Sequence, residues 1–579
     1  MGAWATKRAT ALIVAAGLPT AALAQGDPLA EPFPATSTIG ALVDGVSGVR
    51  LDGRAISVAG VGDINGDGID DVAIGGFDAA GDRRVFVVFG RGDGLANPVV
   101  LEDLDGTNGF QMFDTIDDES LGVSISAAGD VNDDGVDDML VGAPSRSGSA
   151  DSDGAAYVVF GRDAGTAGGF PAEFDLAGLD GSNGVRLEPI GGIPDRLERF
   201  GAAVSSAGDV NGDGIGDVAV GARAADVVDR EYAGRVYVFF GTREPFPAVL
   251  SGADLDGMNG LRINGPVSFS GTTGAAGGSD VNADGVEDLV VNTRLPQDFV
   301  VFGQSGGFPA DLDLGDIDGT NGFVIDSGLP GCFCGDVAMG GDFNGDGIDD
   351  LVATNPFGGP QGVYGLHAGQ SFVVFGRRDG FPAQLDLASL DGTNGVRIDG
   401  DEREDFSGGS VAFANDVDGD GFDDLLLGAE FRGSTTTGSG SYYSFDAGPG
   451  AAYVVFGRSD GLPPVLGLAE LGANQAIRID GERRGDLLGG SIAAAGDVNG
   501  DGRTDVIVGS REDDAYVVYG RGASCAPDLD GDGELTIFDF LEFQNLFDAM
   551  DPAADFDDDG DLTIFDFLAF QNAFDAGCP

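Results

Sequence analysis

The chain has 579 residues, and its 97 acidic side chains far outnumber its 30 lysines and arginines, which gives a formal net charge of -67. Such a surface repels nucleic acids and anionic membranes, so neither is expected as a partner. The apolar fraction of 42% is that of a globular protein, and the acidity therefore does not indicate disorder.

The first 24 residues have the pattern of a secretory signal. Two basic residues precede an apolar run from Ala9 to Gly17, and residues 22–24 match a small-residue cleavage site. The run is too short to span a bilayer, and no later stretch is long and apolar enough to do so. We expect residues 1–24 to be removed, residues 25–47 to form a linker, and the protein to be secreted or held at the cell surface without membrane insertion.

From residue 48 onward, a unit of about 72 residues repeats. The second unit shows the pattern: an alternating strand at Gly122–Gly129, an acidic loop, two apolar strands at Asp138–Pro144 and Ala155–Gly161, and a last strand at Val185–Pro189. Four short strands per unit, separated by Gly/Asp turns, are typical of a propeller blade. A parallel β-solenoid is the alternative, but it would need a shorter period.

Each unit carries a nine-residue acidic loop, such as DVNDDGVDD at Asp130–Asp138. In all seven copies positions 1, 5 and 9 are Asp, position 3 is Asn or Asp, and position 6 is Gly, which can turn sharply without steric cost. A hard cation such as Ca²⁺ takes six to eight oxygens at ~2.3–2.6 Å, and these offsets supply them. Solvated Asp/Gly turns, the alternative, do not need four oxygens at the same offsets each time. The predicted calcium ligands are Asp63, Asn65, Asp67, Asp71, Asp130, Asn132, Asp134, Asp138, Asp209, Asn211, Asp213, Asp217, Asp280, Asn282, Asp284, Asp288, Asp342, Asn344, Asp346, Asp350, Asp416, Asp418, Asp420, Asp424, Asp497, Asn499, Asp501 and Asp505.

The strands of the units are out of phase with the loops. The first copy of the fourth strand, Gly48–Gly53, precedes the first loop, whereas the last unit ends near Gly520 without a fourth strand. The sequence therefore predicts that the N-terminal strand pairs with the last blade. This closes an all-β ring of seven blades over residues 48–521 and removes an open sheet edge.

The order of these motifs resembles the FG-GAP repeat of integrin alpha-chain propellers. The tripeptide Gly-Ala-Pro, which gives the repeat part of its name, occurs unchanged at residues 142–144, and Phe-Gly occurs at residues 200–201. The fourth unit departs most from the pattern but keeps its loop ligands. The resemblance implies a seven-bladed propeller with Ca²⁺ in the loop that joins the first two strands of a blade.

The longest insertions lie between the second and third strands, on the face opposite the acidic loops. They are Arg223–Gly234, Asn355–Gly369 and Glu430–Gly450. The last contains our candidate ligand-binding residues in a Ser/Thr/Gly-rich context, since Arg and aromatic side chains in adaptable loops suit ligand contact. These candidates are Arg432, Tyr442, Tyr443 and Phe445. A tolerated surface insertion is the alternative.

We find no catalytic set in the sequence. The only histidine, His367, falls in an insertion and is expected to be an exposed loop residue. Nearly all Asp pairs belong to the acidic loops. Cys332 and Cys334, one residue apart, are expected to be a structural pair or buried thiols.

Residues 522–579 form a different module with two 12-residue acidic loops, each followed by a helical pattern with Phe and Leu on one face. The spacing is that of an EF-hand loop with Asp at the last position. The predicted side-chain ligands are Asp528, Asp530, Asp532, Thr536, Asp539, Asp555, Asp557, Asp559, Thr563 and Asp566. The module resembles a dockerin, which implies a small helical domain, two further Ca²⁺ ions and a cohesin-like receptor.

Each copy of this module carries an Ile-Phe pair before the last ligand. In dockerins this region contributes to receptor contact, so Ile537, Phe538, Ile564 and Phe565 are candidates for the docking face; equally, they are candidates for a small core. Cys525 and Cys578 bracket the module, and in an exported protein we expect them to form a disulfide.

The sequence thus predicts a secreted, non-catalytic, calcium-binding propeller that recognises a protein or glycan through its insertions and is anchored by a dockerin-like tail. The alternative is an extracellular polysaccharide-degrading enzyme or accessory component borne on a dockerin. Adhesion between cells, which the integrin resemblance suggests, differs from the first hypothesis only in its partner.

Overall fold

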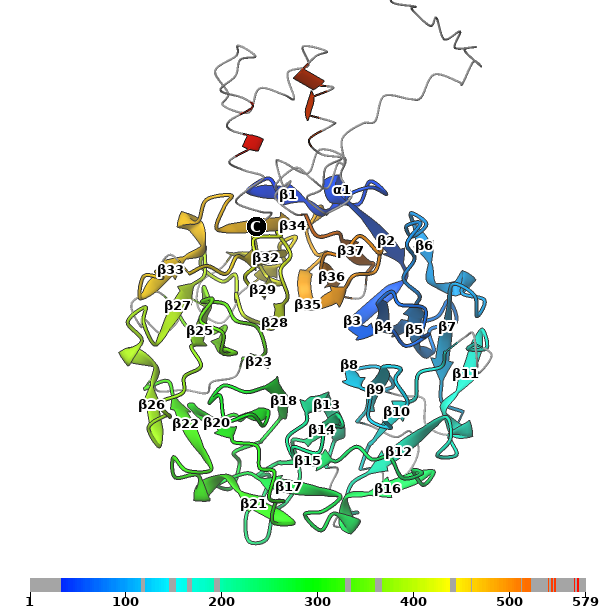
Figure 1. The fold of residues 1–579 in the computed structure, drawn as a ribbon, viewed down its shortest axis with the longest axis vertical. Helices are drawn as coiled ribbons and strands as arrows, with labels where there is room; N and C mark the ends of the chain where they lie inside the picture. Colours follow the sequence, from blue (N-terminus) through cyan, green and yellow to red (C-terminus); the bar gives the residue numbers. More distant parts are fainter. Residues whose placement is uncertain are drawn as a thin grey trace, which may run out of the picture.

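The computed structural model describes residues 33–115, 120–144, 153–163, 169–191, 198–328, 335–359, 367–437, 444–459, 461–511 and 513–521, and the isolated positions 540, 543, 544, 546, 547, 567, 570 and 571. Within these residues the chain forms seven five-stranded sheets arranged in a closed ring (Figure 1). The prediction of a seven-bladed propeller is therefore confirmed. No helix in this part of the chain is long and apolar enough to cross a membrane.

In each of the first four blades the strands run from the axis outward in the following order. Blade 1 contains β3 (Arg54–Gly62), β4 (Asp71–Phe77), β5 (Arg83–Val88), β7 (Gly109–Phe113) and β11 (Glu173–Asp175). Blade 2 contains β8 (Ile125–Gly129), β9 (Asp138–Ala143), β10 (Ala155–Val159), β12 (Gly184–Glu188) and β16 (Val249–Ser251). Blade 3 contains β13 (Phe200–Gly208), β14 (Asp217–Ala222), β15 (Arg235–Phe239), β17 (Gly260–Asn264) and β21 (Asp311–Asp313). Blade 4 contains β18 (Gly274–Ser279), β19 (Asp288–Asn292), β20 (Gln297–Val301), β22 (Gly322–Asp326) and β26 (Gln384–Asp386).

The remaining three blades follow the same order. Blade 5 contains β23 (Val337–Met339), β24 (Leu351–Asn355), β25 (Gln370–Val374), β27 (Gly395–Asp399) and β33 (Val465–Gly467). Blade 6 contains β28 (Ser410–Ala414), β29 (Asp424–Ala429), β32 (Ala451–Val455), β34 (Ala476–Asp480) and β1 (Thr36–Thr38). Blade 7 contains β35 (Leu488–Gly496), β36 (Asp505–Ser510), β37 (Ala515–Val518), β2 (Gly48–Asp52) and β6 (Val99–Val100). A separate hairpin pairs β30 (Thr435–Thr437) with β31 (Ser444–Asp446) in the third insertion.

The ring closes through the N-terminal strand, as the sequence predicts. β2 pairs antiparallel with β37, and Leu51 lies opposite Ala515. β1 also takes part in closure, because it pairs in parallel with β34 of blade 6. Part of the segment expected as a linker, including β1 and the short helix α1 (Ile39–Leu42), thus lies within the ring.

Each blade has a fifth, outermost strand that the four-strand prediction did not include. In blade 1 this strand is β11, which comes from the connection between the third and fourth strands of blade 2 and pairs in parallel with β7. A short 3-10 turn usually follows such a strand, and Asp175 caps the one at Leu176–Gly178 by accepting the N–H of Ala177. The equivalent turns are η1 (Leu101–Asp103), η3 (Gly252–Asp254), η4 (Leu314–Asp316), η6 (Leu387–Ser389) and η7 (Leu468–Glu470). Every blade is therefore hydrogen-bonded to a strand that its neighbour contributes.

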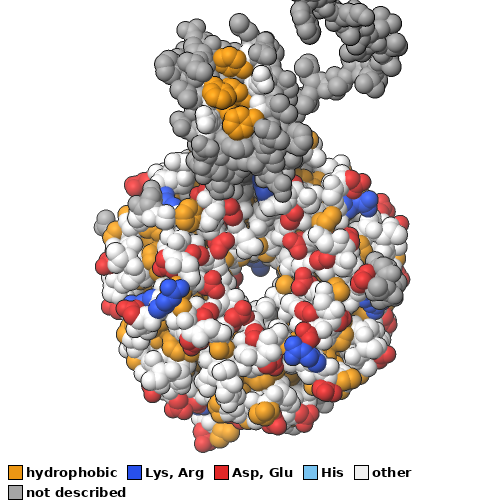
Figure 2. Space-filling model, viewed as in Figure 1, with side chains coloured by type: hydrophobic (Ala, Val, Ile, Leu, Met, Phe, Trp, Pro, Cys, Tyr) orange, Lys and Arg blue, Asp and Glu red, His pale blue; other side chains and the backbone are white. Residues whose placement is uncertain are grey.

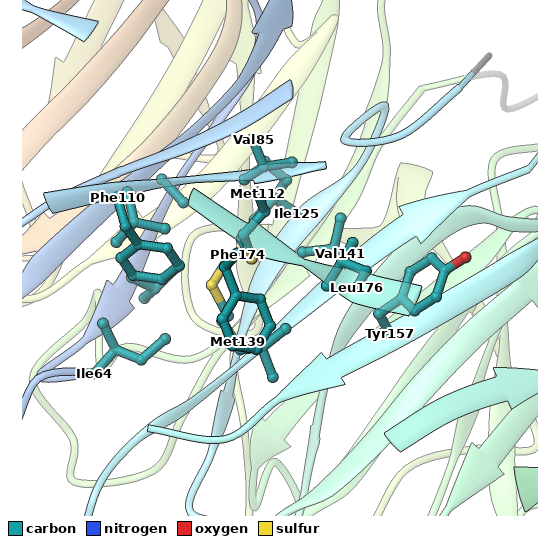
Figure 3. Close-up of a cluster of buried hydrophobic side chains, with 14 of the residues drawn as sticks. Ile64, Val85, Phe110, Met112, Ile125, Met139, Val141, Tyr157, Phe174 and Leu176 are labelled. Carbon is teal, nitrogen blue, oxygen red and sulfur yellow. The ribbon is translucent and has the colours of Figure 1, made fainter. Parts of the chain in front are cut away.

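The hydrophobic core is divided into layers between adjacent blades. The layer between blades 1 and 2 contains Phe110, Met112, Met139 and Val141, all fully buried, and the ring of Phe174 from β11 covers it (Figure 3). The second strand of a blade is covered on both faces, which explains its continuous apolar run. Each fully buried apolar side chain of this size contributes about 1.5–3 kcal/mol to stability.

Candidate metal-binding loops

The seven acidic loops join the first and second strands of the seven blades, so they lie on one face of the ring, which we call the loop face. Acidic side chains gather around the central opening of the ring on the face that Figure 2 shows. The loops have one shared backbone arrangement, which the second loop, Asp130–Asp138, illustrates.

The first Asp of the loop closes the turn. In the second loop, the carboxylate of Asp130 accepts the N–H groups of Asp134 at 3.0 Å and Gly135 at 2.8 Å. The fifth residue, Asp134, accepts the N–H of Val136 at 3.1 Å. All seven loops make the same three hydrogen bonds. The carboxylates at positions 1 and 5 are therefore held in the same orientation in each blade.

The Asp at the ninth position of each loop is buried. Asp138 is completely buried, and its carboxylate accepts the N–H of Val131 at 3.0 Å and that of Gly161 at 2.8 Å. Gly161 lies two residues after the third strand, and a Cβ at this position would lie 2.3 Å from the backbone oxygen of Asp137. The same Asp-to-glycine hydrogen bond occurs in all seven blades. The glycine after the third strand is thus required by the loop, a link that the sequence analysis missed.

Burial and neighbouring charge make the ninth carboxylate costly to ionise without a cation. Burial, and then the negative charges at positions 5 and 1, raise the pKa of Asp138, Asp217, Asp288 and Asp505 to about 8. The remaining three ninth-position groups shift in the same direction, mainly through burial, and they are Asp71, Asp350 and Asp424. A bound cation would reverse this effect because it favours the ionised form.

The third position differs between loops. In four of the six loops that have Asn there, its amide nitrogen faces the ninth carboxylate, as in Asn65 to Asp71 at 3.3 Å. In the seventh loop the amide of Asn499 instead donates to Asp501 at 3.1 Å. In the sixth loop it is Asp, and one oxygen each of Asp416, Asp418 and Asp420 lie within 4.8 Å of one another, so this triad could hold a metal ion.

The donor set fits a hard cation such as Ca²⁺. Within the seven propeller loops, three buried oxygens at ligand positions have no hydrogen-bond partner: Asn282 Oδ1, Asp288 Oδ2 and Asp418 Oδ1. An unsatisfied buried oxygen costs free energy, and a cation with oxygen ligands would satisfy it. The loops are therefore chemically suited to the ion that the sequence predicts.

An acidic residue at position 8 connects neighbouring blades. The carboxylate of Asp137 in blade 2 accepts the N–H of Asp63 in blade 1 at 3.1 Å. Asp70 of blade 1 does the same for Asp497 of blade 7, at 2.8 Å, across the seam where the ring closes. Glu287, Asp349 and Asp423 make the equivalent contact elsewhere. An acidic residue recurs at position 8 of the loops, and this recurrence is the sequence signal for the contacts between neighbouring blades.

Arg432, the predicted ligand contact of the third insertion, has a structural role instead. Its side chain is 13% exposed and forms ion pairs with Asp401 at 2.7 Å and Asp480 at 3.5 Å, while the hydroxyl of Tyr453 accepts its Nε–H at 3.0 Å. This network argues against a ligand contact by Arg432. Tyr442 and Tyr443 lie outside the described residues, and Phe445 belongs to β31 with a side chain that is not described.

His367 corrects the expectation of an exposed loop residue. It is half-buried, and its ring contacts those of Phe357 and Phe406, with centroids 5.9 Å and 5.1 Å away. Cys332 and Cys334 lie outside the described residues.

In the C-terminal module, every predicted ligand, docking residue and cysteine lies outside the described residues. They are Asp528, Asp530, Asp532, Thr536, Asp539, Asp555, Asp557, Asp559, Thr563, Asp566, Ile537, Phe538, Ile564, Phe565, Cys525 and Cys578. Among the described positions, aromatic side chains from the two copies pack together. Phe570 is fully buried, and its ring stacks on Phe543 with the centroids 4.4 Å apart.

A family model for the FG-GAP repeat matches residues 121–159, 200–239, 335–374, 407–455 and 489–524. These segments begin in or just before the first strands of blades 2, 3, 5, 6 and 7. The chain is an FG-GAP repeat β-propeller. Blades 1 and 4 have the same strands and loops as the matched blades, although the family model does not match them.

The propeller is related to integrin alpha chains. Integrin alpha-PS2 of Drosophila melanogaster is 30% identical over 241 residues, which are 42% of this chain and 15% of that protein. Integrin alpha-4 of Xenopus laevis is 30% identical over 177 residues, 30% of this chain and 14% of that protein. Phosphatidylinositol-glycan-specific phospholipase D of Rattus norvegicus is 30% identical over 172 residues, 29% of this chain and 18% of that protein. The chain thus spans 14–18% of the length of these relatives.

Proposed function

We propose that this protein is an exported, non-catalytic propeller that Ca²⁺ stabilises, and that it recognises a protein or glycan through the face opposite the loops. The observation that carries the proposal is the set of seven equivalent loops whose buried ninth carboxylate ties the loop to the third strand. A cation there would neutralise the loop charges and fix the hairpin between two strands of each blade. The ion would be structural, and its removal would loosen the blades.

Thermal unfolding of the full chain tests the role of Ca²⁺. Sites of this kind bind with Kd of ~10⁻⁴–10⁻³ M, so the midpoint is expected to rise steadily as Ca²⁺ is added in the millimolar range. Mg²⁺ is the matched control, because it is smaller and gives up its water reluctantly. An unfolding midpoint that is the same in EDTA and in Ca²⁺ would refute the proposal.

We further propose that residues 522–579 anchor the protein to a cohesin-like receptor. The packing of Phe543 against Phe570 supports a module in which the two copies fold together. Retention of the full chain on an immobilised cohesin should require Ca²⁺, and Asp528→Ala with Asp555→Ala should abolish it. Retention that survives chelation would exclude this form of anchoring.

An enzyme is the alternative function, as a polysaccharide-degrading component or an accessory to one. Two observations favour it. One relative is named as a phospholipase D, and the exposed carboxyl group of Asp336 lines the cavity at the centre of the ring. Turnover of a polysaccharide or a phosphatidylinositol-glycan that Asp336→Asn abolishes would establish this alternative and exclude the first proposal.

A further inference from the structure

A pocket of about 500 Å³ opens on the face opposite the loops, where blades 3 and 4 meet, and we call it the arginine pocket. Three arginines and two aromatic rings line it: Arg199, Arg223, Arg294, Tyr232 and Phe269. Arg223 and Tyr232 lie in the first insertion, and Arg294 follows the second strand of blade 4. The pocket therefore combines the insertion of one blade with the connections of the next.

No acidic side chain in the described part of the chain neutralises the three arginines. Within the described ranges none of them forms an ion pair, although the chain carries 97 acidic residues. Other arginines of the same blade are paired; Arg262, for example, lies 2.7 Å from Asp311. Arg223 is half-buried, and burial together with the charges of Arg199 and Arg294 lowers its pKa. The cluster is thus a concentration of positive charge on an acidic protein.

Glu198, which precedes Arg199 in the sequence, does not neutralise the positive charge of the arginine pocket. Glu198 is buried, accepts a hydrogen bond from the hydroxyl of Tyr237 at 3.1 Å, and interacts with the charge of Arg235. It therefore belongs to the interior of blade 3. As far as the structure describes the chain, the guanidinium groups of the pocket are available to an anion from solution.

The backbone around the pocket is held in an unusual conformation. Arg199, Tyr232 and Phe269 all have left-handed φ angles, of 57°, 51° and 62°, which side chains of this size rarely adopt. Hydrogen bonds hold two of them there: Asp226 accepts the N–H of Tyr232 at 2.8 Å, and the N–H of Phe269 donates to the Glu231 carbonyl at 2.8 Å. Such strain is concentrated at binding sites, where the surrounding structure holds side chains ready for a ligand.

The aromatic rings form an exposed platform. Tyr232 and Phe269 stack with centroids 5.8 Å apart and planes 22° apart, and they are 41% and 66% exposed. Val228 and Val267 nearby are also exposed, at 86% and 48%. Exposed apolar surface next to charged groups marks a site of interaction. Arg223 and Arg294 also line the cavity of about 560 Å³ at the centre of the ring. The aromatic platform therefore lies beside the opening of this central cavity.

We propose that the arginine pocket binds an acidic sugar residue of a glycan. The apolar face of a sugar ring would stack on Tyr232 and Phe269, and its carboxylate or sulfate would receive hydrogen bonds from the guanidinium groups. The volume suits a short saccharide. A glycan with an isolated acidic residue is favoured over a polyanion, because the rest of the surface repels repeated negative charge. This inference rests on the proposed recognition of a ligand by this face and names its class.

Titration calorimetry of the full chain at fixed Ca²⁺ tests the inference with three ligands that share one core. Lactose is neutral, sialyllactose adds a carboxylate sugar, and sulfolactose adds a sulfate, so the last two distinguish the sources of the anion. We expect one or both acidic ligands to bind at least about tenfold more tightly than lactose, and the difference to shrink with salt. Equal binding of all three, or binding of none, would overturn the inference.

Matched variants locate the site. Arg294→Gln and Arg223→Gln should each weaken binding of the acidic ligand about tenfold. Arg91→Gln removes the same charge from an exposed arginine that is paired with Asp93, and it should leave the affinity within about twofold. Phe269→Asn, which tolerates the left-handed backbone, should weaken lactose and the acidic ligands alike. Affinity unchanged in the two pocket variants would refute the site.

The inference and the proposed function fail in different ways. If only an acidic peptide binds, and Arg294→Gln weakens it, recognition by this face stands but the ligand class is wrong. If chelation leaves the unfolding midpoint unchanged while sialyllactose still binds in the pocket, the calcium proposal is wrong and the pocket inference stands.

Discussion

Asp418→Asn in the sixth loop should have opposite effects with and without calcium. The carboxylate oxygens of Asp416, Asp418 and Asp420 lie within 4.8 Å of one another, and burial followed by the charges of Asp420 and Asp416 raises the pKa of Asp418 to about 7. At this distance each pair of like charges repels by roughly 1 kcal/mol in water and roughly 3.5 kcal/mol near a protein surface. Without a cation, removing one charge should therefore stabilise the fold.

In EDTA we expect Asp418→Asn to stabilise the protein by about 1–3 kcal/mol after screening, or a rise of about 1–3 °C in the unfolding midpoint for a protein of this size. In ~10 mM Ca²⁺, an occupied loop with Kd of ~10⁻³–10⁻⁴ M contributes about 1.4–2.7 kcal/mol. The variant has one charged ligand fewer, so its gain from Ca²⁺ should be smaller than that of the wild type.

Differential scanning calorimetry measures both effects. The reciprocal change Asn344→Asp in the fifth loop is the matched control, since it creates the same triad; it should destabilise in EDTA and increase the gain from Ca²⁺. A lower midpoint of Asp418→Asn in EDTA would contradict the reasoning, because it would mean that the three carboxylates do not repel one another.

Three further predictions follow from the fold and the loops. In EDTA, stability should fall as pH rises from about 4 towards 8, because folded Asp138 and its equivalents hold protons up to a pKa of about 8 whereas the unfolded groups release them near 3.8; Ca²⁺ should abolish this fall, and urea unfolding at several pH values measures it. Leu51→Ala removes a fully buried side chain from the strand that closes the ring and should cost about 2–5 kcal/mol in urea unfolding, whereas Val100→Ala, at a 39% exposed position of the same blade, should cost far less. Gly161→Ala should destabilise by about 1–3 kcal/mol because its Cβ would lie 2.3 Å from the Asp137 oxygen, and calorimetry showing no change would contradict the role given to this glycine.

The sequence predicted the features that recur with constant spacing. The loops, the seven blades and the pairing of Gly48–Asp52 with the last blade all follow from counting identical units, and the structure has them. The sequence did not predict the outermost strands because each is only two or three residues long, as in Glu173–Asp175. A strand so short has no alternation to detect, and its partner lies in another unit.

The sequence does not predict side-chain roles that depend on contacts between residues far apart in the chain. Arg432 is in an insertion whose composition suits ligand binding. The structure, however, brings two carboxylates to it: Asp401, which follows β27 of blade 5, and Asp480, at the end of β34 of blade 6. The arginine pocket was missed for the same reason: Arg199, Arg223 and Arg294 are far apart in the chain and have no common motif. Composition indicates which residues can bind, but only the packing shows which of them remain unpaired.

Crystals of the full chain grown in Ca²⁺ and examined by anomalous diffraction would test the central claim most directly. The account predicts a calcium peak in each of the seven loops, ~2.3–2.6 Å from oxygens of residues 1, 3, 5 and 9. Loops without peaks at saturating Ca²⁺, with the amide of Asn65 still donating to Asp71, would contradict it.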